Sequence, residues 1–148
     1  MLIQTLKILF SRDLEKLKQE IMLYESENNI WIINGNIANS AGNLCLHLVG
    51  NLNTYIGAEI GKTGYIRNRE LEFSMKNIPR QELIKKIEDT IRVVENSLDS
   101  LKDDELENEY PLLVFAEKTS ISYFMVHLAV HLSYHLGQVN YHRRLLDK

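Results

Sequence analysis

The stretch HLAVHLSYHLGQ, residues 127–138, guides the interpretation of the whole 148-residue sequence. It places His127, His131 and His135 four residues apart in a run with helical periodicity. A four-residue step turns only about 40° around an α-helix, so the three imidazoles form a column. His131 and His135 share the apolar stripe that a helix buries, and His127 lies at its edge. Burying an imidazole costs free energy unless a proton partner or a metal satisfies it, so the column predicts core hydrogen bonds or a metal site.

A fourth histidine lies on a second apolar segment. Residues 41–60 are apolar nearly all round, which predicts a buried helix carrying His47. Asn43, Asn51 and Thr54 fall within roughly 40° of His47 on that helix. Leucines would fill a purely structural face, whereas small and polar side chains leave room for solvent or a ligand. We therefore expect these three polar residues to contact a cofactor or substrate.

The two histidine-bearing helices suggest a shared ion. Histidines at positions i and i+4 commonly bind zinc, because one helix then brings two imidazoles onto one cation. A third imidazole from a facing helix leaves a coordination position for water or substrate. The sequence therefore predicts one divalent ion bound by His47, His131 and His135. Hydrogen-bonded core histidines remain the alternative at this stage.

The rest of the chain predicts an all-α fold. Four segments predict long helices. Apolar residues recur every three or four positions in residues 2–24 and 79–101, residues 41–60 are apolar nearly all round, and residues 120–146 contain the histidine run with its helical periodicity. Thr119 is the expected N-cap of the last helix. Four helices with a long second connection predict a four-helix bundle, in a single domain spanning residues 1–148.

Two connections contain features that the helices do not explain. Residues 61–77 hold two glycines and no sustained periodicity, so we expect a long crossover loop. Two arginines one residue apart on this long connection, Arg67 and Arg69, are expected to close over the metal site, where a guanidinium would bind a carboxylate of a thiol cofactor or acidic substrate bidentately. The alternative is a solvated loop with surface ion pairs. Residues 110–115 are β-prone, and we expect an extended segment packed over the bundle.

Composition excludes several classes of function. Seventeen basic and twenty acidic side chains give a net charge of −3, without the basic cluster that nucleic-acid binding requires. No stretch reaches the roughly 18 apolar residues of a membrane span. Cys45 is the single cysteine, so an internal disulfide is excluded and a reducing, cytoplasmic compartment is expected.

The metal-binding pattern also resembles a known superfamily. His47 in NLCLHLVGNL, with His131 and His135 in HLAVHLSYHLGQ, resembles the metal triad of the DinB-like superfamily, which includes bacillithiol and mycothiol transferases. HLVGNLNTYIGAEIG followed by GYIRNRELEFS resembles a bacterial branch known as a domain of unknown function. The resemblance spans the whole chain and implies an up-down-down-up bundle, a zinc or nickel ion and a homodimer. His127 and His142 do not match ligand positions.

Three functions are compatible with these residues. The first is a metal-dependent enzyme that transfers a low-molecular-weight thiol onto a small electrophile, with a metal-dependent hydrolase as the alternative chemistry. The second is a non-catalytic metal- or ligand-binding module. The third is a plain helical dimer whose core histidines are hydrogen-bonded. The sequence identifies no catalytic general base, because Glu70 and Glu72 lie on a loop whose path it does not define.

Overall fold

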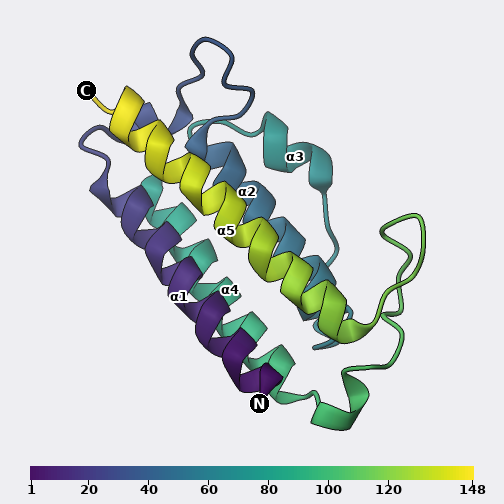
Figure 1. Ribbon diagram of the computed structural model, residues 1–148. Helices are drawn as coiled ribbons and strands as arrows, with labels where there is room; N and C mark the ends of the chain where they lie inside the picture. Colours follow the sequence, from purple (N-terminus) through teal and green to yellow (C-terminus); the bar gives the residue numbers. More distant parts are fainter.

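The computed structural model describes residues 1–148 and is entirely helical apart from its connections (Figure 1). Apolar residues at three-four spacing form the long helices, as predicted: α1 (Leu2–Leu23), α2 (Ala41–Leu52), α4 (Arg80–Asp99) and α5 (Ile121–Leu146). A π-helical turn, Asn53–Ala58, continues α2 without a break. This wider turn changes which residues share a face with His47, since a uniform α-helical step no longer applies beyond residue 52.

The four long helices form a bundle with up-down-down-up order (Figure 1). α1 runs upward in that view, α2 and α4 run downward, and α5 returns upward across the front. α1 and α2 each pack against both α4 and α5. α1 and α2 are therefore diagonal neighbours, and α2 faces α5. This arrangement brings His47 opposite the histidine column.

One hydrophobic core joins the four helices. Twenty-nine buried residues form a single cluster that draws on every long helix. The first connection adds Ile30 and Trp31 to this cluster through a 3₁₀ turn, Glu27–Trp31, whereas Ile33 is 52% exposed. Apolar burial of this kind is the main driving force for a bundle, because the individual helices are only marginally stable alone.

Serine side chains cap the two helices that carry the triad, α2 and α5. Ser40 accepts a hydrogen bond from the Asn43 backbone N–H at the start of α2, and Ser120 accepts one from Tyr123 N–H at the start of α5. The prediction that Thr119 caps the last helix is therefore wrong by one residue. Thr119 instead uses its backbone carbonyl to accept a hydrogen bond from Tyr110 N–H.

The crossover contains a short helix that the sequence analysis missed. α3 (Arg69–Ser74) lies in the segment predicted as a loop and packs beside α2 (Figure 1). Six residues are too few to show a repeating apolar pattern. Asn68 caps α3 by accepting from Leu71 N–H, and Asn43 on α2 donates to the backbone carbonyls of Glu72 and Met75. Polar contacts, rather than an apolar stripe, therefore hold α3 in place.

The segment before α5 is irregular. Tyr110 is fully buried and its hydroxyl donates to the Tyr55 carbonyl oxygen at 2.6 Å. Residues 112–115 are more than a third exposed, so only the first residue of the predicted extended segment packs into the core. The single bridge between Glu109 and Ser120 is too short to form a sheet.

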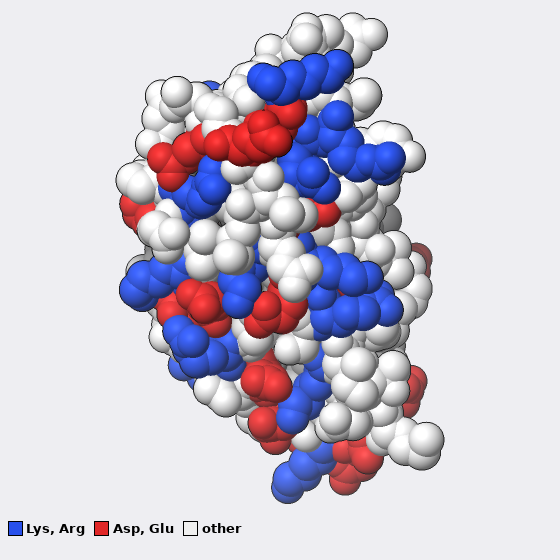
Figure 2. Space-filling model, turned by 90° about the vertical axis from the view of Figure 1, so that its left-hand side faces the viewer, with Lys and Arg blue, Asp and Glu red and all other residues white.

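The surface charges are mixed. On the face shown in Figure 2, Lys and Arg side chains alternate with Asp and Glu side chains, and neither sign forms an extended area. This pattern agrees with the near-balanced composition and lacks the basic stripe of a nucleic-acid interface. None of the helices has the length and apolar character needed to cross a membrane.

Candidate metal centre

Three histidines converge between α2 and α5. His47 Nε2 lies 3.3 Å from His131 Nε2, which in turn lies 3.1 Å from His135 Nε2. These three side chains form the one group of histidine, cysteine and carboxylate side chains whose ligand atoms are close enough together to hold a metal ion. The predicted triad is therefore brought together by the fold, because α5 supplies two imidazoles at i and i+4 and α2 supplies the third from across the interface.

The spacing of the three nitrogens fits a divalent ion. Two nitrogens bound to a tetrahedral zinc at about 2.05 Å lie about 3.3 Å apart, and octahedral neighbours lie about 3.0 Å apart. The observed 3.3 and 3.1 Å separations fall in this range. Neutral imidazoles have one lone pair each, so three Nε2 atoms this close need a shared cation or protons between them.

The outer nitrogen of His47 is fixed by a carboxylate. His47 Nδ1 lies 3.0 Å from Glu72 Oε1 on α3. An ionised carboxylate only accepts hydrogen bonds, so Nδ1 carries the hydrogen and Nε2 presents its lone pair to the triad. A carboxylate behind a histidine ligand orients the ring and makes it a better donor to the metal. Glu72 therefore holds His47 in the orientation and tautomer that a metal-binding histidine needs.

Arg67 keeps that carboxylate ionised. Its Nε donates to Glu72 Oε2 at 2.8 Å and its Nη2 donates to Glu72 Oε1 at 3.0 Å. Burial opposes ionisation of Glu72, but the hydrogen bonds from His47 and Arg67 outweigh it and lower the carboxyl pKa below 4.5. The Arg67 guanidinium also lies over the Tyr55 ring, with 5.7 Å between the guanidinium carbon and the ring centroid. Arg67 was expected to bind a carboxylate of a cofactor or substrate, but its guanidinium is instead paired with Glu72 of this chain.

Gly50, on α2, leaves the space that the Glu72 side chain of α3 occupies. A Cβ atom at residue 50 would lie 1.9 Å from Glu72 Oε2, so any side chain there would displace the carboxylate. Phe73, the next residue on α3, covers His47 with ring centroids 5.1 Å apart. A glycine one turn from His47 and a carboxylate in the crossover are visible in the sequence, but their contact is not, because it depends on the path of α3.

The histidines on α5 differ in their outer contacts. His135 Nδ1 lies 2.7 Å from Gln138 Oε1, which again leaves Nε2 with its lone pair toward the triad. His131 Nδ1 is buried and has no hydrogen-bond partner. Burial, with smaller contributions from neighbouring His135 and His47, lowers the pKa of His131 to about 4. Burial also lowers the pKa of His135 below 6.5, so both α5 histidines are neutral near pH 7, which is the form that can bind a metal.

The predicted cofactor-binding residues are distributed differently. Asn51 and Thr54 are on the same helical run as His47, and each has a buried side-chain oxygen without a protein partner. Asn43 is fully buried, and its amide is committed to Ser40, Lys76 and the α3 backbone. Arg69 is exposed and stacks over Phe73 rather than facing the triad. Asn51 and Thr54 therefore keep unused hydrogen-bonding capacity, whereas the Asn43 amide does not.

The two remaining histidines have structural contacts. His142 is buried, its Nδ1 lying 2.6 Å from the Tyr24 hydroxyl and its Nε2 lying 2.8 Å from the Ile32 carbonyl oxygen. His127 packs edge-on against Phe115, with ring centroids 4.7 Å apart. Neither belongs to the metal-binding group, and His142 is an example of the hydrogen-bonded core histidine that the sequence left open.

A comparison with family models gives one match. A model described as "Protein of unknown function (DUF1572)" matches residues 3–148. A search of curated proteins and a search of solved structures found no match. The family match covers the helices that supply the triad, α3 with Glu72, and every connection between them.

Proposed function

The chain belongs to the DUF1572 family of proteins of unknown function, and on that premise we propose that it is a DinB-like metalloprotein that transfers a thiol onto a small electrophile. The single observation that carries the proposal is the convergence of three Nε2 atoms at 3.1 and 3.3 Å. The ion is zinc or nickel, because both accept imidazole ligands. Two of the three rings also have an oxygen acceptor behind them, as metal-binding histidines usually do.

The donor set favours an anionic fourth ligand. Three neutral imidazoles leave both positive charges of a divalent ion uncompensated, and no Asp or Glu belongs to the group. When bound, such an ion lowers the pKa of a thiol or water that reaches its open position. In the proposed reaction the thiol releases its proton to solvent, its sulfur bonds to the electrophilic carbon, and the leaving group departs with the bonding electrons and takes up a proton from solvent.

The neighbouring side chains support thiol transfer over hydrolysis. A hydrolase commonly uses a carboxylate or histidine near the metal to take a proton from water. Glu72 is the nearest candidate, but its two oxygens are already bonded to His47 and Arg67. Asn51 and Thr54 have buried oxygens without partners and would orient a thiol substrate by hydrogen bonding. A hydrolase and a non-catalytic metal module remain the alternatives that the experiments below distinguish.

Metal content tests the first step. Untagged protein should contain about one equivalent of zinc or nickel by mass spectrometry, and His131→Ala should lose most of it. His127→Ala is the matched control, one turn earlier on α5, and should keep the metal. Equal metal content in His131→Ala and the unaltered protein would remove the proposed centre.

Spectroscopy tests the second step. Cobalt-substituted protein titrated with glutathione, bacillithiol or cysteine should develop a thiolate-to-cobalt charge-transfer band. Thiol-dependent consumption of a model electrophile should accompany it. If no thiol changes the spectrum and ester or amide hydrolysis is found instead, the hydrolase becomes the better description. If neither activity appears although metal is bound, the centre is a binding module.

We also propose a homodimer in the cytoplasm. Tyr123, Val126, Val130 and Tyr134 form a line of exposed apolar side chains on α5, between 43% and 64% exposed, which we call the α5 stripe. No Lys, Arg, Asp or Glu occurs between residues 121 and 142, so two copies can approach without like-charge repulsion. The free, buried Cys45 suits the reducing cytoplasm, where small thiols are abundant.

A further inference from the structure

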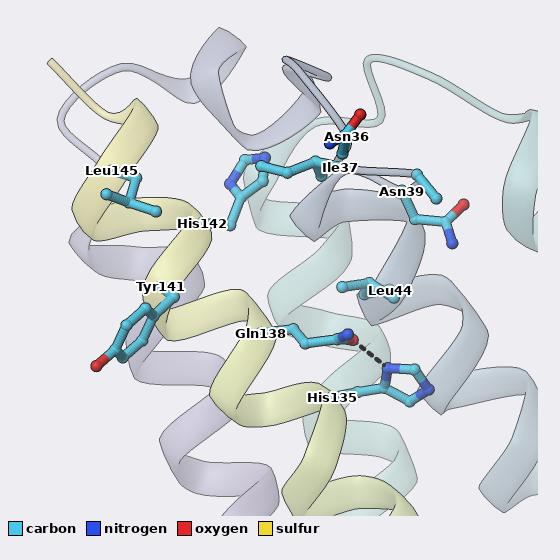
Figure 3. A pocket seen from close by; sticks show the side chains of 10 residues that line it. Asn36, Ile37, Asn39, Leu44, His135, Gln138, Tyr141, His142 and Leu145 are labelled. Atoms are coloured by element: carbon cyan, nitrogen blue, oxygen red, sulfur yellow. Dashed lines mark hydrogen bonds between the residues drawn. The ribbon is translucent and has the colours of Figure 1, made fainter.

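A cavity of about 450 Å³ lies beside the metal centre. The connection before α2 forms one wall and the second half of α5 forms the other (Figure 3). Ile37, Leu44 and Leu145 give it an apolar lining, and Asn36, Asn39 and Gln138 add amide groups. Its volume is within the range of pockets that bind small organic molecules. We call it the α5 cavity.

The α5 cavity contains no fully charged residue. None of its ten lining residues is Asp, Glu, Lys or Arg. A charged ligand would lose hydration on entry without gaining an ionic partner, which disfavours anions and cations alike. This contrasts with α3, where Arg67 and Glu72 already form a complete ion pair. The lack of charged side chains in the lining therefore favours an uncharged ligand.

The cavity has free hydrogen-bonding groups at defined places. Gln138 Oε1 lies 2.7 Å from His135 Nδ1, so its amide nitrogen keeps both hydrogens for another acceptor. Figure 3 shows the Gln138 side chain, on the α5 wall of the cavity, directed at the His135 ring of the same helix. Asn36 and Asn39 form no side-chain hydrogen bond within the chain. An occupant with a carbonyl or similar acceptor could bond to Gln138.

His135 connects the cavity to the triad. Its Nδ1 side faces Gln138 and the cavity, and its Nε2 lies 3.1 Å from His131 Nε2. A molecule in the cavity therefore lies against the ring that would hold the metal. Substrate groups that do not react commonly bind in such an adjoining pocket and position the reacting atom.

We propose that the α5 cavity binds the non-reacting part of the electrophilic substrate, an uncharged and largely apolar organic group with one hydrogen-bond acceptor directed at Gln138. This inference rests on the proposed thiol transfer and specifies its second substrate. It excludes carboxylate-bearing and ammonium-bearing electrophiles as preferred substrates.

A matched pair of probes tests the charge rule. Phenylacetamide and 2-phenylethylammonium are similar in size; the first carries the hydrogen-bond acceptor, and the second carries a positive charge at pH 7.5. Calorimetric titration of the purified protein, with its metal content measured, should give at least tenfold tighter binding of the amide. Leu145→Glu places a carboxylate in the cavity at a position that is 57% exposed, so the fold tolerates it. This variant should bind the amide at least tenfold more weakly and the ammonium more tightly.

Leu113→Glu is the control, because Leu113 is 62% exposed and lies outside the cavity. This variant should prefer the amide over the ammonium to the same extent as the unaltered protein does. If the ammonium binds as tightly as the amide, or if Leu145→Glu changes neither affinity, the inference is overturned. If the purified protein holds no metal but binds the amide, the proposed function is contradicted and the inference about the cavity is not. If the protein holds metal but does not bind the amide, the inference about the cavity is contradicted and the proposed function is not.

Discussion

At the scale of single residues, Gly50 has the clearest consequence for the metal centre. A methyl group there would overlap the Glu72 carboxylate, so Gly50→Ala should separate that carboxylate from His47. Losing such a partner of a metal-binding histidine typically weakens metal affinity by about 10–100-fold. Competition with a chromogenic chelator would measure the change.

Gly137→Ala provides the control for that measurement. A Cβ atom at residue 137 meets no atom within 4 Å, and the alanine should stabilise α5 slightly. Its metal affinity should stay close to that of the unaltered protein. Equal affinities for Gly50→Ala and Gly137→Ala would show that the Glu72 carboxylate does not support the centre.

His142 should make folding stability depend on pH. Burial lowers its pKa below the ordinary 6.5, so the folded protein holds the neutral ring between Tyr24 and Ile32. Above about pH 6.5 the ring is neutral in both states and its contacts stabilise fully. As the pH falls below that value, the unfolded chain takes up a proton at His142 more readily than the folded protein does, so the free energy of unfolding decreases.

Urea unfolding of metal-free protein from pH 8 to pH 5 tests this expectation. His142→Gln keeps a donor and an acceptor but cannot gain a proton. The variant should be less stable at pH 8, because its hydrogen bonds are poorer, and its stability should fall less steeply on acidification. Parallel pH profiles for the two proteins would contradict the role given to His142.

At the scale of secondary structure, the start of α5 depends on one hydroxyl group. Ser120 Oγ accepts the Tyr123 N–H at 3.1 Å, so Ser120→Ala should lower the free energy of unfolding by about 1 kcal/mol. Thr119→Ala should cost less, because Thr119 contributes its backbone carbonyl, which alanine retains. Urea denaturation of both variants would compare them, and a larger loss in Thr119→Ala would contradict the assignment.

At the scale of the whole molecule, the α5 stripe should determine the oligomeric state. The unaltered protein should sediment with twice the mass of one chain. Val130→Glu combined with Tyr134→Glu should give a folded monomer, because symmetric pairing would bring like charges together. Ile8→Glu is the control, since Ile8 is 57% exposed on α1, away from the stripe. A dimer that survives the double substitution would place the interface elsewhere.

The four long helices could be predicted from the sequence because a helix is a local structure. Three-four spacing of apolar residues defines the buried stripe of α1 and α4, and α2 is apolar nearly all round; both patterns can be read without knowing the neighbours. The column of His131 and His135 follows from the same geometry, since i and i+4 always lie on one side of a helix. The bundle and two of its three candidate ligands were therefore predictable from periodicity alone.

Tertiary structure decided what these residues contact. His47 meets the column only because α2 packs against α5, and Glu72 reaches His47 only because α3 packs beside α2 over Gly50. Such contacts join residues far apart in the chain, and no periodic pattern records them. The α5 cavity likewise depends on the position of the connection before α2. The sequence determined the helices and the ligand chemistry, and the packing of α2, α3 and α5 decided which groups surround the three imidazoles.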